Sequence, residues 1–141
     1  MAQKENNIIP MIFDEAFYRK MATQKWRQQD YKKAAEYYEK VLELSPKDFD
    51  IQQHYAQCLV KLNIGKKAER LFYENIVKDF HVAESFYELS QLNIELNEPN
   101  KAFLFGINYV ILSEDKDFRE MLEKTFAVAY TNEQKIELEA Q

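Results

Sequence analysis

Glycine, proline and cysteine are scarce in this sequence of 141 residues, which contains two glycines, three prolines and one cysteine. An all-β fold needs many turns, so this shortage of turn-forming residues argues against one. A single cysteine, Cys58, cannot form a disulfide within the chain. The sequence therefore gives no indication of a small secreted domain that is held together by disulfides.

Long hydrophobic runs are also missing. The apolar stretch at residues 8–13 is too short and too interrupted for the core of a signal peptide or for a membrane span. We therefore expect a soluble protein located in the cytoplasm, with no membrane partner.

Positive charge is in short supply over the second half of the chain. Residues 1–70 carry 13 Lys and Arg against 10 Asp and Glu, a net charge of +3, whereas residues 71–141 carry 6 against 14, a net charge of −8. No strongly basic face is evident, so we expect no nucleic-acid partner. The asymmetry bears on the choice of protein partner and on the association rate.

Motifs of catalysis and of metal binding are lacking as well. The two histidines, His54 and His81, are far apart and show no metal-ligand spacing with other residues. Cys58 is followed by two apolar residues, which favours a small buried side chain over a nucleophile. The only glycines, Gly65 and Gly106, cannot form a glycine-rich phosphate loop. We expect no enzyme activity, no cofactor and no metal.

Apolar and aromatic residues, in contrast, are abundant. They make up 46% of the sequence and include ten phenylalanines and nine tyrosines. A disordered chain has fewer of both. This content is sufficient for a continuous core in one domain.

Residues of one kind recur every 34 positions, which predicts a repeat protein. Small residues recur at Ala34, Ala68 and Ala102. Further triplets in the same register are Met21/Tyr55/Leu89, Ala22/Ala56/Ser90, Trp26/Val60/Ile94 and Leu42/Ile76/Val110. A single triplet is weak evidence, but several in one register are hard to attribute to chance.

Each 34-residue unit divides into two helical stretches. In residues 31–44 the apolar positions follow a period of 3.6 residues, with Asp30 as the expected N-cap and Ser45-Pro46 as the stop. Thr131 and Gln134 suggest a capping box for the last helix. Short connections make neighbouring helices antiparallel. We predict helices at about 11–28, 31–44, 49–62, 66–78, 82–96, 99–112, 116–130 and 133–140.

Residues 15–46 resemble a tetratricopeptide repeat. They supply its large–small pair as Met21-Ala22, its small residue as Ala34, its aromatic residue as Tyr38 and its proline as Pro46. The match is fair in the second unit and degenerate in the third. The resemblance implies an all-α, right-handed superhelix of antiparallel helix hairpins. The predicted single domain, 1–141, then consists of repeats at about 15–48, 49–82 and 83–116 with capping helices at about 116–140.

The resemblance also implies a concave groove lined by the first helix of each repeat. The groove would run from basic to acidic, although these residues could also be ordinary exposed charges. Trp26 is open to two interpretations, packing or ligand contact. Acidic Glu84 and Glu88 stand where the relatives that bind the carboxylate tails of heat-shock chaperones need cations, so that function is not expected. The implied groove residues are Arg19, Lys20, Thr23, Trp26, Arg27, Asp50, Gln53, His54, Gln57, Lys61, Glu84, Tyr87, Glu88, Gln91 and Glu95.

Taken together, these features predict a non-catalytic adaptor or scaffold that binds a protein or peptide in the groove. The alternative is an assembly module that associates with itself, or docks within a larger protein, through the convex face of helix 99–112. That helix is apolar nearly all round, which suggests cover on more than one side. Residues 8–13 or the final helix could instead fold back over it. The expected convex interface comprises Leu71, Tyr73, Val77, Leu104, Phe105, Ile107 and Ile111.

Overall fold

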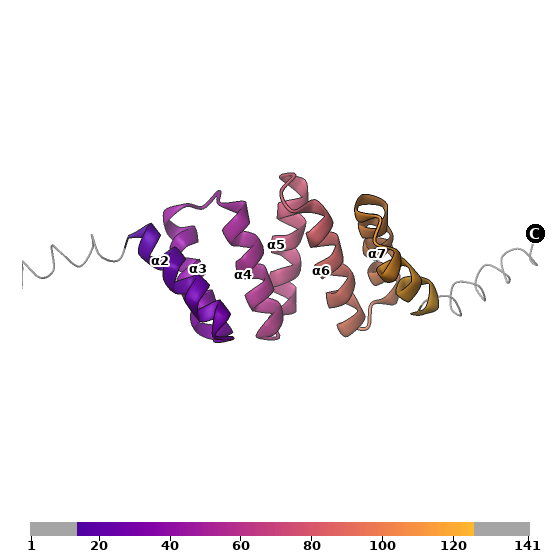
Figure 1. Cartoon of the computed structure of the whole chain (residues 1–141), viewed down its shortest axis with the longest axis horizontal. Coiled ribbons are helices and arrows are strands. Elements are labelled where there is room, and N and C mark those ends of the chain that lie inside the picture. Colours follow the sequence, from indigo (N-terminus) through magenta and orange to yellow (C-terminus); the bar gives the residue numbers. More distant parts are fainter. Residues whose placement is uncertain (1–13, 126–141) are drawn as a thin grey trace, which may run out of the picture. The chain divides into compact units, whose positions relative to one another are not determined.

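The structure is a computed structural model that describes residues 14–125, and every regular element in that range is an α-helix. Six helices have complete bounds, and residues 116–125 are also helical (Figure 1). The predicted boundaries agree to within one residue for five helices, but the first helix begins at Glu15 and not at about residue 11, because Asp14 caps its N-terminus. The capping box at Thr131 and Gln134, the helix at 133–140 and residues 8–13 lie outside the described residues. The six helices are α2 (Glu15–Arg27), α3 (Tyr31–Leu44), α4 (Phe49–Lys61), α5 (Gly65–Val77), α6 (Val82–Glu95) and α7 (Pro99–Ser113).

Aspartate residues begin three successive helices. The side chains of Asp14, Asp30 and Asp48 accept hydrogen bonds from backbone amides three residues later, at 2.9, 3.2 and 3.1 Å. Each cap satisfies an amide that has no partner inside the helix, and such a cap contributes about 1 kcal/mol. The role predicted for Asp30 is therefore confirmed.

The 34-residue repeat is visible in the backbone of the turns. Gln29, Asn63 and Asn97, which lie 34 residues apart, all have left-handed backbone angles, with φ near 60°. After each of them, the next amide closes the turn onto a carbonyl five residues earlier, at 2.8–2.9 Å. This arrangement ends a helix and reverses the chain. Glycine is the usual residue at this position, so its scarcity did not prevent the turns from forming.

The chain divides into two units, residues 1–81 and 82–141. In unit 1, α2 packs on α3, α3 on α4, and α4 on α5. The small residues of the predicted register, Ala22, Ala34, Ala56 and Ala68, are fully buried. This burial places them where helices meet. Small side chains let helices approach closely, and the larger neighbours fill the remaining space. The expectation of a single domain remains a prediction.

Unit 2 has α6 packed on α7, with residues 116–125 completing the core. Its buried centre is formed by Ala102, Phe118 and Leu122. Gly106 leaves room for the Leu122 side chain in this packing. A Cβ atom built on it would lie 2.6 Å from Leu122 Cδ1 and 3.0 Å from the Ser90 hydroxyl oxygen. In the 34-residue register, Gly106 corresponds to Tyr38 and Phe72 in unit 1, and both of those aromatic side chains are buried. Gly106 has no side chain, and the side chain of Leu122 packs against it instead.

Candidate protein-binding faces

Unit 1 carries a cluster of four aromatic rings contributed by α2, α3 and α4. Trp26 lies edge-on to Tyr31, with ring centroids 5.2 Å apart, and to His54 at 6.4 Å. His54 in turn stacks on Tyr38 at 6.0 Å. Trp26 is half-buried and His54 is exposed, so one edge of the cluster remains open to solvent. Trp26 thus packs within the protein and is also accessible, and neither of its two interpretations is eliminated.

Three exposed cations of unit 1 have no ionic partner among the described residues. Lys20, Arg27 and Lys61 are exposed and form no ion pair with any described residue. Lys61 Nζ lies 5.9 Å from the centre of the Tyr31 ring. Lys20 and Arg27 line a shallow hollow on α2 together with Arg19, Thr23, Gln24 and Gln28. The face therefore combines aromatic surface with available positive charge.

Two of the predicted groove residues, Arg19 and Asp50, form ion pairs within unit 1. Arg19 forms ion pairs with Glu15 and Asp48, joining α2 to the start of α4. The hydrogen bond from Arg19 holds the pKa of Glu15 below its usual value. Partial burial is the largest single influence on Asp48 and opposes its ionisation. The hydrogen bonds from Arg19 and from the Ile51 amide, together with the positive charge of Arg19, still lower the pKa of that carboxyl. Asp50 pairs with His81.

The prediction that Gln53 lies exposed in the groove is wrong. Only 3% of Gln53 is exposed, because its side chain belongs to a buried cluster of amides between α4 and α5. Asn75 Nδ2 donates to Gln53 Oε1 at 2.8 Å and to the Phe49 carbonyl at 3.1 Å, and Gln52 Nε2 donates to Asn75 Oδ1 at 3.0 Å. The repeat pattern expects a small residue at position 75. The larger Asn75 is accommodated because it finds polar partners.

In unit 2 the predicted groove residues lie on α6. Glu84 and Glu95 are exposed, and Gln91 is half-buried. Tyr87 is also half-buried and packs edge-on against Tyr109 at 5.1 Å and against Phe118 at 5.2 Å. It therefore acts mainly in the core of unit 2. The acidic character of this face is provided by Glu84, Glu88 and Glu95.

The expected convex interface is only partly exposed. Leu104 and Ile111 are 60% and 70% exposed, and Val77 and Tyr73 in unit 1 are exposed as well. Phe105 is half-buried and packs on Phe86 with ring centroids 6.3 Å apart. Ile107 and Leu71 are half-buried too. The expectation of four exposed side chains on helix 99–112 is therefore wrong for Phe105 and Ile107, because each contacts its own unit.

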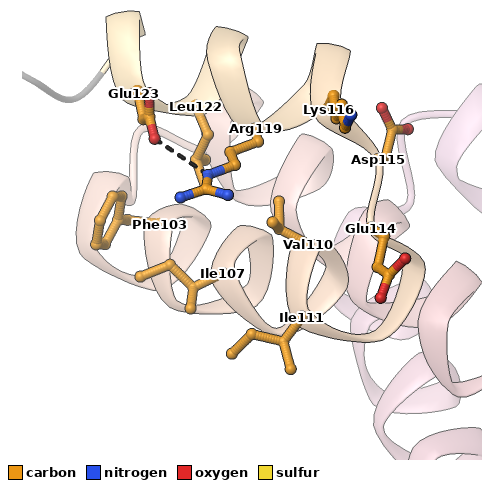
Figure 2. A pocket seen from close by; sticks show the side chains of 10 residues that line it. All are labelled: Phe103, Ile107, Val110, Ile111, Glu114, Asp115, Lys116, Arg119, Leu122 and Glu123. Atoms are coloured by element: carbon orange, nitrogen blue, oxygen red, sulfur yellow. Dashed lines mark hydrogen bonds and ion pairs between the residues drawn. The ribbon is translucent and has the colours of Figure 1, made fainter.

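Sequence reasoning missed a hollow in unit 2 between α7 and residues 116–125 (Figure 2). Phe103, Ile107, Val110 and Ile111 from α7 form its apolar wall, with Leu122 opposite. Charged residues form the rest of the lining, and Arg119 Nε bonds Glu123 Oε1 at 3.3 Å. The remaining charged lining residues are Glu114, Asp115 and Lys116. The available signal was the 34-residue register, which places Arg119 and Glu123 at positions that are buried in the second and third repeats, at Ile51 and Ser85 and at Tyr55 and Leu89.

Metal binding and thiol chemistry can each be examined in the part of the chain that the structure describes. In that range no three side chains of His, Cys, Asp or Glu are grouped so that they could hold a metal ion. Cys58 is buried, as expected, and burial raises the pKa of its thiol to about 12. A neutral, inaccessible thiol is a poor nucleophile. Among the same residues no helix is long and apolar enough to cross a membrane.

Comparison with known proteins agrees with this architecture. Residues 25–72 match the family model described as tetratricopeptide repeat. The resemblance to tetratricopeptide repeat proteins is confirmed. A crystal structure of MamA protein matches with a TM-score of 0.70 at 19% sequence identity, over 82% of this chain and 63% of the MamA chain. The predicted all-α fold of helix hairpins is therefore confirmed. A search of curated proteins found no matching relative.

Proposed function

We propose that this tetratricopeptide repeat chain is a non-catalytic module that binds another protein through the face of unit 1 that carries Trp26, His54 and Lys61. One observation supports this most strongly. The half-buried Trp26 and the exposed His54 form an open aromatic edge, and Lys61 lies beside it over the Tyr31 ring. Lys20 and Arg27 of α2 are exposed and form no ion pair with a described residue. Aromatic anchors beside available cations suit a ligand that carries an apolar or aromatic side chain among carboxylates.

The acidic α6 face of unit 2 offers the opposite charge. Glu84 and Glu95 are exposed there and form no ion pair with a cation of the described residues. A protein ligand with one acidic and one basic segment therefore suits the two units better than a purely acidic tail. Because these charges are exposed, added salt should weaken the binding. A cytoplasmic location and the absence of nucleic-acid binding are parts of the same proposal.

The experiment uses Trp26, the only tryptophan in the chain, as its reporter. Glu-rich and Lys-rich synthetic peptides of equal length, each with one phenylalanine, are titrated while the Trp26 emission is followed. We expect saturable binding of the Glu-rich peptide, and a loss of about tenfold or more in affinity in the variant Lys20→Glu with Arg27→Glu. The control is Lys32→Glu with Lys33→Glu, which alters exposed cations on α3 that are not part of the face.

Equal affinity for the two peptides would contradict the proposal. So would acidic-peptide binding that is indifferent both to salt and to the charge reversals on α2.

The alternative function is assembly through the convex side of α7, and one observation favours it. Leu104 and Ile111 expose 60% and 70% of their surface, and exposed apolar patches often mark association sites. Light scattering on the wild type and on Leu104→Glu tests it. An assembly module predicts a wild-type oligomer that dissociates in the folded variant. A wild type that is monomeric at high concentration would eliminate this alternative.

A further inference from the structure

Few buried side chains hold α2 in unit 1. Among the described residues of α2 only Ala22 is buried, whereas α4 has seven buried residues. α2 packs on α3, and α3 packs on α4. The position of α2 relative to α4 therefore depends strongly on contacts between the exposed and half-buried side chains of these two helices.

One such contact joins three helix ends through Arg19. Its guanidinium pairs with Glu15 in the first turn of α2 and with Asp48, the N-cap of α4. Ser45, the C-cap of α3, donates a hydrogen bond to the other carboxylate oxygen of Glu15 at 2.8 Å. Asp48 also accepts the Ile51 amide at 3.1 Å, which fixes its carboxylate at the start of α4. A planar guanidinium can bridge two carboxylates in this way, so the network ties the first turn of α2 to the other two helices.

A second contact between α2 and α4 lies further along both helices. Trp26 is seven residues after Arg19, which places the two side chains on one side of α2, about 10 Å apart along its axis. His54 is six residues after Asp48 on α4. Trp26 lies edge-on to His54, with ring centroids 6.4 Å apart. A movement of α2 away from Asp48 would therefore also change the approach of these two rings.

The charge of Arg19 is directed into the protein. Its side chain is 39% exposed and meets two carboxylates, so a ligand carboxylate would have to compete with both of them. Lys20 and Arg27 on the same helix are exposed and form no ion pair with a described residue. These two cations are better placed than Arg19 to attract an acidic ligand.

We propose that Arg19 is a positioning residue, which pairs with Asp48 to hold α2 against α4 and so keeps Trp26 beside His54. The inference rests on the proposed function, because it names the residue that sets the geometry of the same protein-binding face. A face that is already ordered loses less conformational freedom on binding than one that the ligand must order. The proposal gives Arg19 a role within the protein, in place of the ligand contact expected from the repeat register.

The test compares Asp48→Ser with the matched control Asp14→Ser. Serine is also a good N-cap residue, so each variant keeps a cap on its helix, and each loses one negative charge. Asp14 caps α2 but is exposed and forms no ion pair with a described residue, so only Asp48→Ser breaks the pair with Arg19. Quenching of Trp26 emission by acrylamide is measured without ligand. The Glu-rich peptide with one phenylalanine is then titrated.

We expect acrylamide to quench Trp26 about twofold more strongly in Asp48→Ser than in the wild type or in Asp14→Ser, because α2 can then move away from α4. The affinity for the Glu-rich peptide should fall about three- to fivefold, since the binding arrangement is populated for less of the time. Arg19→Met should have the same two effects, and combining it with Asp48→Ser should add nothing further. Circular dichroism checks that each variant is folded.

Direct contact between Arg19 and the ligand predicts a change of opposite sign. Asp48→Ser would then free the guanidinium and strengthen binding of the Glu-rich peptide. That result, unchanged quenching in Asp48→Ser, or equal effects of Asp14→Ser would each overturn the proposal. A wild type that binds no peptide would contradict the proposed function, whereas the quenching comparison needs no ligand and would still decide whether Arg19 positions Trp26.

Discussion

The buried amide cluster of unit 1 should be a strong determinant of its stability, and Asn75→Ala tests this. Asn75 is fully buried and takes part in three hydrogen bonds of 2.8–3.1 Å with Gln52, Gln53 and the Phe49 carbonyl. Each such bond contributes about 1 kcal/mol, and a buried partner that loses its bond costs about 1–3 kcal/mol more. Gln52 keeps a second acceptor in the Leu71 carbonyl at 3.3 Å, which limits the loss. Asn75→Ala should therefore lower the free energy of unfolding by about 2–4 kcal/mol.

The measurement is urea denaturation of both proteins, followed by Trp26 fluorescence and by circular dichroism at 25 °C. Trp26 reports on unit 1, which contains the cluster. Asn108→Ala is the matched control. Asn108 is exposed, and its side chain makes only a local bond to the Leu104 carbonyl at 2.8 Å. The control should change stability by no more than about 0.5 kcal/mol.

A cost for Asn75→Ala below about 1 kcal/mol, or one equal to that of the control, would refute the reasoning. In that case the amides would be retained for a reason other than stability. A stabilising Asn75→Leu variant would not refute it, because replacing a polar cluster by apolar side chains of similar size can be favourable.

Three further predictions follow from the packing. Alanine in place of glycine usually raises the stability of an exposed helix by about 1 kcal/mol. Gly106→Ala should fail to give this gain in the free energy of unfolding, because the new Cβ meets Leu122 and the Ser90 hydroxyl oxygen. Adding Leu122→Ala should relieve part of the steric penalty, as measured by urea denaturation of the double variant. Cys58 should react with a thiol reagent at pH 8 at least about 100-fold more slowly in the folded protein than in urea, since the thiol is buried and its pKa is raised to about 12, and equal rates would contradict its burial. Burial also raises the pKa of Tyr38 to about 12. The folded protein therefore favours the neutral forms of Cys58 and Tyr38, so its free energy of unfolding should hold below pH 9 and fall as the pH rises towards 12. An unchanged urea midpoint between pH 7.5 and 10.5 would contradict this prediction.

The sequence by itself determined the repeat, the helices and much of the core. The 34-residue spacing of Ala34, Ala68 and Ala102 predicted three sites of close helix approach, and all three residues are fully buried. Local signals also located the helix ends, as with Asp30, because capping depends on residues three or four positions away. Such features can be read from one sequence since they depend on short-range chemistry or on repetition.

Only the tertiary structure decided which polar and apolar side chains are free to meet a partner. Gln53 looked like a groove residue but is buried, because Asn75 on another helix provides a polar partner for it. Phe105 looked exposed but packs on Phe86, and Gly106 is explained by Leu122, which lies 16 residues further along the chain. A repeat register states which face of a helix a residue occupies. Whether that face is covered depends on the side chains of neighbouring helices, and their contacts are made only when the hairpins pack.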